Sequence, residues 1–232
     1  MKILKQLGAA VVVLSLASLS WADNPRLEAK NRLQSAGHVL SSIMAAPDKG
    51  IPNEVLEHAK CIAVVPTLVK GGFVFGGEGG EGVASCRTEH GWSAPAFFVI
   101  GGGSWGLQIG AEDVNLVMVF ENKKGMQRLM SSKFKLGAGG SVAAGPVGRS
   151  ASADTNLTMN TEILTYSRAK GVFAGLTLHG AVIKRDSDVM KNVYGTDTTT
   201  RSVLTGQVKT PPMADPFIDA IHHAMHQARV SG

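Results

Sequence analysis

The chain has 232 residues, of which 44% are hydrophobic and 18% charged, and its formal net charge is +5 at pH 7. This length supports one domain with a proper hydrophobic core, or at most two. The mild positive charge permits attraction to an anionic surface. It does not amount to the dense Lys/Arg stripe of a nucleic-acid-binding protein, so we expect no nucleic-acid partner.

The first 22 residues have the pattern of a secretory signal peptide. Lys2 and Lys5 precede an uncharged apolar run from Leu7 to Leu19, and Ser20-Trp21-Ala22 supplies small residues at the cleavage positions. The run is shorter than the ~20 residues that a membrane span needs, although an uncleaved anchor is the alternative. We therefore expect a single exported domain over residues 23–232, either free in the periplasm or peripheral on a membrane.

Residues 24–44 predict an amphipathic helix. Apolar residues recur there at helical spacing, and basic residues lie largely off that stripe. Such a helix can lie in a membrane interface, where each cation near anionic lipid contributes about 1 kcal/mol. The stripe could instead pack on the protein's own core, which is the usual outcome for a globular helix. The stripe comprises Ala29, Leu33, Ala36, Leu40, Ile43 and Met44, and the cations are Arg26, Lys30 and Arg32.

A short helix starting at Pro52 and a buried strand from Ile62 to Pro66, closed by the proline, follow in the chain. The two cysteines, Cys61 and Cys86, lie in and beyond this region. A redox or metal-binding pair would need CxxC spacing or neighbouring ligands, and neither is present. In an oxidising compartment, a structural disulfide between the two cysteines is therefore the favoured interpretation.

From Gly71 onward, strand and turn signals dominate. Apolar runs stop against glycine, and most of the 28 glycines lie between residues 71 and 206. Glycine in or beside a strand is tolerated where the chain bends or where another backbone comes close, so the region predicts tightly bent β structure. Turns are expected at residues 78–80 and 89–91, a hairpin over residues 162–183 and a polar loop at residues 196–201.

Two further segments are expected to be helical. Residues 123–130 predict a helical turn, and residues 216–228 predict a closing amphipathic helix whose stripe includes Phe217 and Ile221. The first of these segments begins a basic cluster, which is either a solvated face or a second contact with lipid. The cluster comprises Lys123, Lys124, Arg128, Lys133 and Lys135.

Motifs that would indicate catalysis or a cofactor are weak. The GxGxxG spacing occurs at residues 77–82 and 101–106, but neither match opens a helix that could hold a pyrophosphate. Ser104 and Ser141 both lack the GxSxG elbow. His222 and His226 have a spacing that can bind a metal, yet the polar face of a helix is the favoured reading. We therefore expect no enzyme activity, no cofactor and no metal.

Five segments, followed by Tyr194-Gly195, carry a family resemblance. They are Lys70-Gly-Gly-Phe-Val-Phe-Gly-Gly, Gly91-Trp-Ser-Ala-Pro-Ala-Phe, Gly102-Gly-Ser-Trp-Gly-Leu-Gln-Ile-Gly-Ala-Glu, Ala144-Gly-Pro-Val-Gly-Arg and Tyr166-Ser-Arg-Ala-Lys-Gly-Val-Phe-Ala-Gly. In this order, over roughly residues 25 to 200, the chain resembles the SYLF domain, also described as the Ysc84 actin-binding-like family. With its export signal it resembles a bacterial exported member.

The resemblance implies lipid binding, in eukaryotic members often to phosphoinositides, through an N-terminal amphipathic helix beside a β-rich body. Some fungal members also bind actin filaments. For an exported protein, a membrane surface with anionic phospholipid is the expected partner. Carried over to this chain, the lipid-contacting helix corresponds to Arg26, Lys30, Arg32, Leu33 and Leu40, to which we add Lys123 and Lys124 from the basic cluster.

The predicted fold is α+β, a bent antiparallel β-sheet or partial barrel with the N- and C-terminal helices packed on it. The predicted function is non-enzymatic, reversible phospholipid binding in the periplasm. The alternative is a structural or protein-interaction module of the envelope. Its docking surface would be the glycine-rich segment Gly137 to Arg149, and the sequence does not specify the protein partner.

Overall fold

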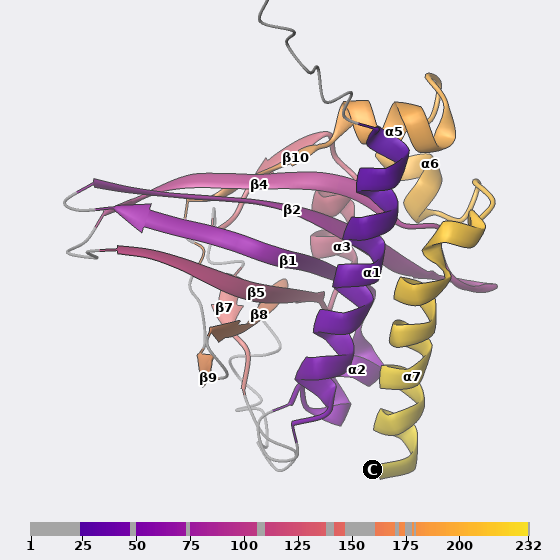
Figure 1. The fold of residues 1–232 in the computed structure, drawn as a ribbon. Helices are drawn as coiled ribbons and strands as arrows, with labels where there is room; N and C mark the ends of the chain where they lie inside the picture. The colour runs from indigo at the N-terminus through magenta and orange to yellow at the C-terminus, as the bar shows by residue number, and fades with distance from the viewer. Residues whose placement is uncertain are drawn as a thin grey trace, which may run out of the picture.

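A computed structural model describes residues 24–46, 50–72, 75–105, 110–137, 142–146, 161–169, 172–174, 178 and 180–231. The predicted signal peptide and much of the segment 137–149 lie outside these residues. The fold is α+β, as predicted, with a strongly curled sheet and helices at both ends of the described chain (Figure 1).

Most helices begin with a recognisable cap. The first helix, α1, is typical, because the Asn24 side chain accepts hydrogen bonds from the Arg26 and Leu27 amides and Pro25 occupies the first turn. The helices are α1 (Pro25–Met44), α2 (Asn53–His58), α3 (Lys123–Leu129), α5 (Ser187–Tyr194), α6 (Thr200–Leu204), η1 (Pro212–Ala214) and α7 (Asp215–Ser231). The helix α5 was not predicted, and α6 begins within the loop expected at residues 196–201.

The strands form one sheet in the order β6-β10-β4-β2-β1-β5-β8-β7, with β3 paired to β2 and β9 to β8. The described pairings are antiparallel except for β7 with β8, which is parallel. The strands are β1 (Cys61–Gly72), β2 (Phe75–Thr88), β3 (Gly91–Trp92), β4 (Ala96–Trp105), β5 (Gly110–Phe120), β6 (Lys133–Lys135), β7 (Val142–Ala144), β8 (Ile163–Ala169), β9 (Val172–Ala174) and β10 (Val182–Arg185).

Two predicted interruptions of the sheet are absent. The strand β1 does not end at Pro66 but continues to Gly72, because a register shift after Val64 accommodates the proline that cannot donate a ladder hydrogen bond. Likewise β2 runs through residues 78–80, where a turn was predicted, and Gly79 pairs with both Val69 and Gly101. These glycines allow strands to lie side by side rather than making the chain turn.

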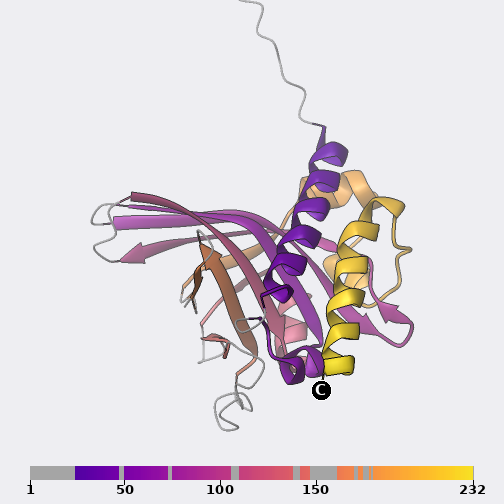
Figure 2. The same ribbon diagram turned by 60° about the horizontal axis from the view of Figure 1, so that its bottom comes forward.

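The helices gather at one end of the sheet. In both views α1 and α7 lie side by side, while β1, β2, β4 and β5 extend away from them (Figures 1 and 2). Close approach of the two helices depends on Gly37, where a Cβ atom would lie 2.3 Å from the carbonyl oxygen of Pro216. The predicted inward stripe of α7 is buried, with Phe217 and Ile221 fully shielded from solvent.

Candidate functional site

The apolar stripe of α1 faces the protein core. Leu33, Leu40 and Ile43 have no solvent-exposed surface and belong to the main hydrophobic cluster. The proposed lipid contacts at Leu33 and Leu40 are therefore wrong for this folded conformation, because the side chains already cover the sheet and α7. Burial in the core removes the same apolar surface from water that a bilayer would have removed.

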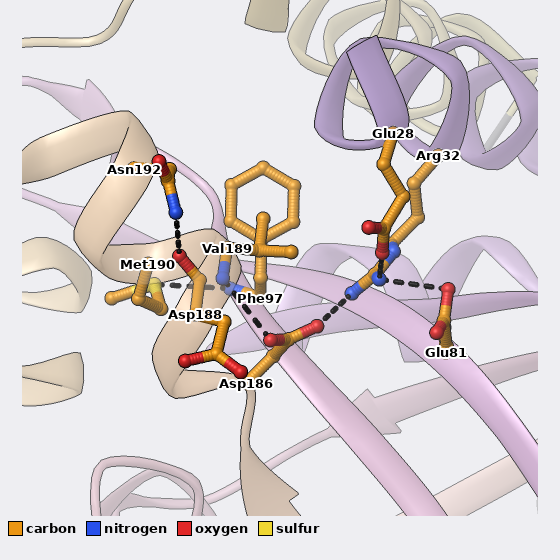
Figure 3. A network of polar contacts seen from close by, with 9 residues as sticks. All are labelled: Glu28, Arg32, Glu81, Phe97, Asp186, Asp188, Val189, Met190 and Asn192. Atoms are coloured by element: carbon orange, nitrogen blue, oxygen red, sulfur yellow. Dashed lines mark hydrogen bonds and ion pairs between the residues drawn. The ribbon is translucent and has the colours of Figure 1, made fainter. Parts of the chain in front are cut away.

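Arg32 is also buried rather than available to lipid, which corrects a third predicted contact. Its guanidinium is 2.8 Å from the carboxylate of Asp186 and 2.7 Å from that of Glu81, and it forms a further ion pair with Glu28 (Figure 3). The same group lies 5.7 Å from the centre of the Phe97 ring. We call these five residues the Arg32 network.

The Arg32 network holds α1 against the sheet and α5. Asp186 also caps α5 by accepting a hydrogen bond from the Val189 amide at 3.2 Å, so one carboxylate serves two elements. Burial, opposed by Arg32 and reinforced by the charges of Glu81 and Asp186, raises the pKa of Glu28 above its ordinary value of 4.5. Three carboxylates around one guanidinium thus leave an excess of negative charge.

The first turns of α1 carry side chains that are open to solvent. Arg26 and Lys30 are exposed, and between them Leu27 keeps 54% of its surface accessible. The Arg26 Nε donates a 3.1 Å hydrogen bond to the carbonyl oxygen of Asn192 on α5, beside the exposed Lys191. We call Arg26, Leu27 and Lys30 the α1 surface. It is small, but it combines cations with an exposed apolar side chain.

The two lysines predicted on α3 have different surroundings. Lys124 pairs with the buried carboxylate of Glu162 at 2.6 Å, and Arg128 pairs with the same carboxylate at 2.7 Å. The single carboxylate therefore offsets one of the positive charges of that turn. Lys123 is exposed at the start of the helix and lines an open hollow together with Lys60 and Arg87. Within the predicted basic cluster, Lys124 and Arg128 thus share a carboxylate partner, whereas Lys123 lines the open hollow.

The remaining predictions concern cysteines, metals and the membrane. The disulfide between Cys61 and Cys86 is present and joins directly opposed residues of β1 and β2. His222 and His226 are exposed on α7, and among the described residues no group of three or more His, Cys, Asp or Glu side chains is placed to hold a metal ion. Across the described ranges, no helix is both long and apolar enough to cross a membrane.

Sequence reasoning did not identify the partners of Arg32. Only Glu28, four residues away on the same helix, follows from helical spacing. Glu81 is 49 residues away and Asp186 is 154 residues away, so their approach depends on strand register and on the position of α5. Arg32 was predicted to lie off the apolar stripe, so Glu28 at helical spacing was the one local signal of an ion pair.

Comparison with known proteins places the chain among relatives of similar sequence. Residues 101–224 match the family described as "Ysc84: Las17-binding protein actin regulator". Protein YSC84 of Saccharomyces cerevisiae is 33% identical over 198 residues, which are 82% of this chain and 42% of that protein. The chain belongs to the Ysc84 family.

Other members of the family have a similar relation to the chain. SH3 domain-containing protein PJ696.02 of Schizosaccharomyces pombe is 35% identical over 197 residues, covering 81% of this chain and 46% of the relative. SH3 domain-containing YSC84-like protein 1 of Homo sapiens is 29% identical over 177 residues, covering 75% of this chain and 52% of the relative. The chain spans about half the length of the curated relatives it matches.

Proposed function

We propose that this member of the Ysc84 family is a non-enzymatic protein of the periplasm that binds anionic phospholipid reversibly through the α1 surface. The observation that carries the proposal is the exposed Leu27 next to Arg26 and Lys30 in the first turns of a helix whose apolar stripe is fixed in the core. The Arg32 network keeps α1 in place, so the cations are presented on a rigid element. A fixed surface requires little ordering upon binding.

The expected affinity is low. Each cation near an anionic bilayer contributes about 1 kcal/mol, and the effect is confined to roughly the Debye length. Arg26 and Lys30 together therefore support contact that is weak and sensitive to salt. Leu27 adds a single apolar side chain, which is too little for stable anchoring. The proposal is accordingly reversible association with a surface rather than insertion.

Vesicle sedimentation tests the proposal. The purified protein should sediment with vesicles containing phosphatidylglycerol and much less with pure phosphatidylcholine vesicles. Arg26→Glu with Lys30→Glu should lower the partition coefficient about tenfold or more. A matched control is Lys133→Glu with Lys184→Glu, which makes the same change in net charge at exposed lysines on β6 and β10. Equal losses in the two double variants would remove the α1 surface from the proposal.

The family description supports a second candidate, binding to a protein partner. It names Las17 binding and actin regulation, and two relatives reported above are named for an SH3 domain. A protein-interaction module would remain in solution with vesicles of either composition. It would form a stable complex in affinity purification from the envelope of its own cell, and that complex would survive the Arg26→Glu and Lys30→Glu changes.

A further inference from the structure

An open hollow of about 910 Å³ lies away from the α1 surface, where four segments meet. The segments are the start of β1, the hairpin of β2 and β3, the start of α3 and the chain between α6 and η1. Each segment contributes one cation, and these are Lys60, Arg87, Lys123 and Lys209. We call this the basic hollow.

The cations of the basic hollow have no carboxylate partner in the described part of the chain. None of the four occurs among the ion pairs between described residues. One carboxylate, the exposed Glu89 in the turn between β2 and β3, lies on the lining. The hollow therefore carries an excess of positive charge that is not neutralised within these residues.

Arg87 is the most firmly held of the four cations. Its Nε donates to the carbonyl oxygen of Ala59 at 3.2 Å, and its guanidinium lies 5.2 Å from the centre of the Trp92 ring. Burial, with repulsion from Arg229 as a smaller cause, lowers the pKa of Arg87. Carbonyl oxygens and a ring therefore orient this cation without neutralising its charge.

The walls of the hollow are joined by specific contacts. Lys60 and Arg87 flank the two ends of the Cys61–Cys86 disulfide, and the Arg87 amide donates a 2.7 Å hydrogen bond to the Lys60 carbonyl. On the opposite side Gly206 has a φ of +78°, and a Cβ atom there would lie 3.2 Å from the Cγ2 of Thr88. The loop carrying Lys209 thus approaches the β2–β3 hairpin closely.

We propose that the basic hollow is a binding site for a ligand that carries a phosphate group. Lysine ammonium and arginine guanidinium groups are the side chains that bind phosphate most strongly. The volume of about 910 Å³ is in the range of small-molecule sites and far exceeds one phosphate. Trp92 offers an apolar ring beside the cations, so the ligand is an organic phosphate. It is either free in solution or the headgroup of a lipid.

Binding measurements with two probes separate the sources. Isothermal titration calorimetry of the purified protein with glycerol 3-phosphate tests a soluble ligand, and inorganic phosphate at equal ionic strength tests the phosphate group alone. Sedimentation with vesicles containing phosphatidic acid tests a headgroup. Saturable binding of glycerol 3-phosphate indicates a free ligand. Binding only to the vesicles indicates a lipid.

Two exposed lysines provide the decisive variant. Lys123→Glu with Lys209→Glu should weaken binding of the responding probe at least about tenfold, because two charge-assisted contacts are replaced by repulsion. Lys133→Glu with Lys184→Glu should change it less than about twofold, since these lysines lie outside the hollow. The exposed positions avoid the packing role of Arg87. Absence of binding to every probe, or equal losses in both double variants, would overturn the proposal.

The basic hollow and the α1 surface can be tested independently. Arg26→Glu with Lys30→Glu should leave binding of glycerol 3-phosphate unchanged while lowering sedimentation with phosphatidylglycerol vesicles. Lys123→Glu with Lys209→Glu should have the opposite effect. It should lower binding of glycerol 3-phosphate and leave sedimentation with phosphatidylglycerol vesicles unchanged. With glycerol 3-phosphate, the inference about the hollow therefore stands or falls separately from the proposed function of the α1 surface. With phosphatidic acid vesicles, which the α1 surface would also bind, it rests on the loss caused by Lys123→Glu with Lys209→Glu.

Discussion

Two arginines each lie against an aromatic ring but have different polar partners. Arg32 and Arg87 each lie over an aromatic ring, at 5.7 Å from Phe97 and 5.2 Å from Trp92. Arg32 is neutralised by three carboxylates, whereas Arg87 donates to carbonyl oxygens and meets no carboxylate among the described residues. The partners, rather than the cation or its ring, distinguish a structural ion pair from a candidate anion site.

The difference also explains why Arg32, which was predicted to contact lipid, is buried in an ion-pair network instead. A buried cation requires partners because desolvation of an unpaired charge is costly, and Arg32 obtains them from β2 and from the start of α5. A half-buried cation beside a hollow keeps part of its hydration and remains available. Charge on a helix therefore does not by itself indicate which surface contacts a ligand.

The largest expected effect is on the Arg32 network. Arg32→Met should lower the free energy of unfolding by about 4 kcal/mol, chiefly because Asp186, whose side chain is 13% exposed, loses its partner. Urea unfolding at pH 7 measures the change. Arg26→Met, at an exposed position of the same helix, is the control and should change stability by less than about 0.5 kcal/mol. A loss below about 1 kcal/mol for Arg32→Met would contradict a structural role.

The disulfide between the residues that flank the basic hollow should contribute slightly less. Cys61 and Cys86 are separated by 25 residues, for which loop-closure entropy gives about 3.5 kcal/mol. Cys61→Ala with Cys86→Ala should therefore lower the free energy of unfolding by that amount in a urea titration. Reductant should destabilise the natural protein to a similar extent and leave the variant unchanged. Equal sensitivity of both proteins to reductant would argue against the disulfide as the cause.

The smallest expected effect concerns the carboxylate excess around Arg32. Because the pKa of Glu28 is raised in the folded protein, the folded state binds a proton more readily than the unfolded chain. The contribution of Glu28 to stability therefore falls as pH rises through and above 4.5. The free energy of unfolding of Glu28→Gln minus that of the natural protein should therefore be higher at pH 7 than at pH 4. The increase should be a few tenths of a kcal/mol, because Glu28 is partly exposed.

Urea unfolding at the two pH values measures this small difference. The control is Glu54→Gln, which removes an exposed carboxylate on α2, outside the Arg32 network. A relative stability of Glu28→Gln that falls from pH 4 to pH 7 would show that attraction to Arg32 outweighs burial and repulsion by the other carboxylates.

Local sequence patterns determined the elements that depend on neighbours in the chain. The stripe of α1 and that of α7 were predicted from helical spacing, the α+β class from the glycine-rich strands, and the disulfide from the absence of other uses for two cysteines. Gly37 illustrates the limit of such reasoning. In the sequence it weakens a helix, whereas in the structure it allows α7 to approach α1 at Pro216.

Tertiary structure decided what covers each face and which charges meet. Periodicity shows that one side of α1 is apolar, but core and bilayer satisfy the same pattern, so burial of Leu33 and Leu40 could not be read from it. The approach of the four cations in the basic hollow depends likewise on strand register and loop geometry over nearly the whole chain. They are Lys60, Arg87, Lys123 and Lys209. Coulomb interactions depend on distance in space, which sequence separation does not specify.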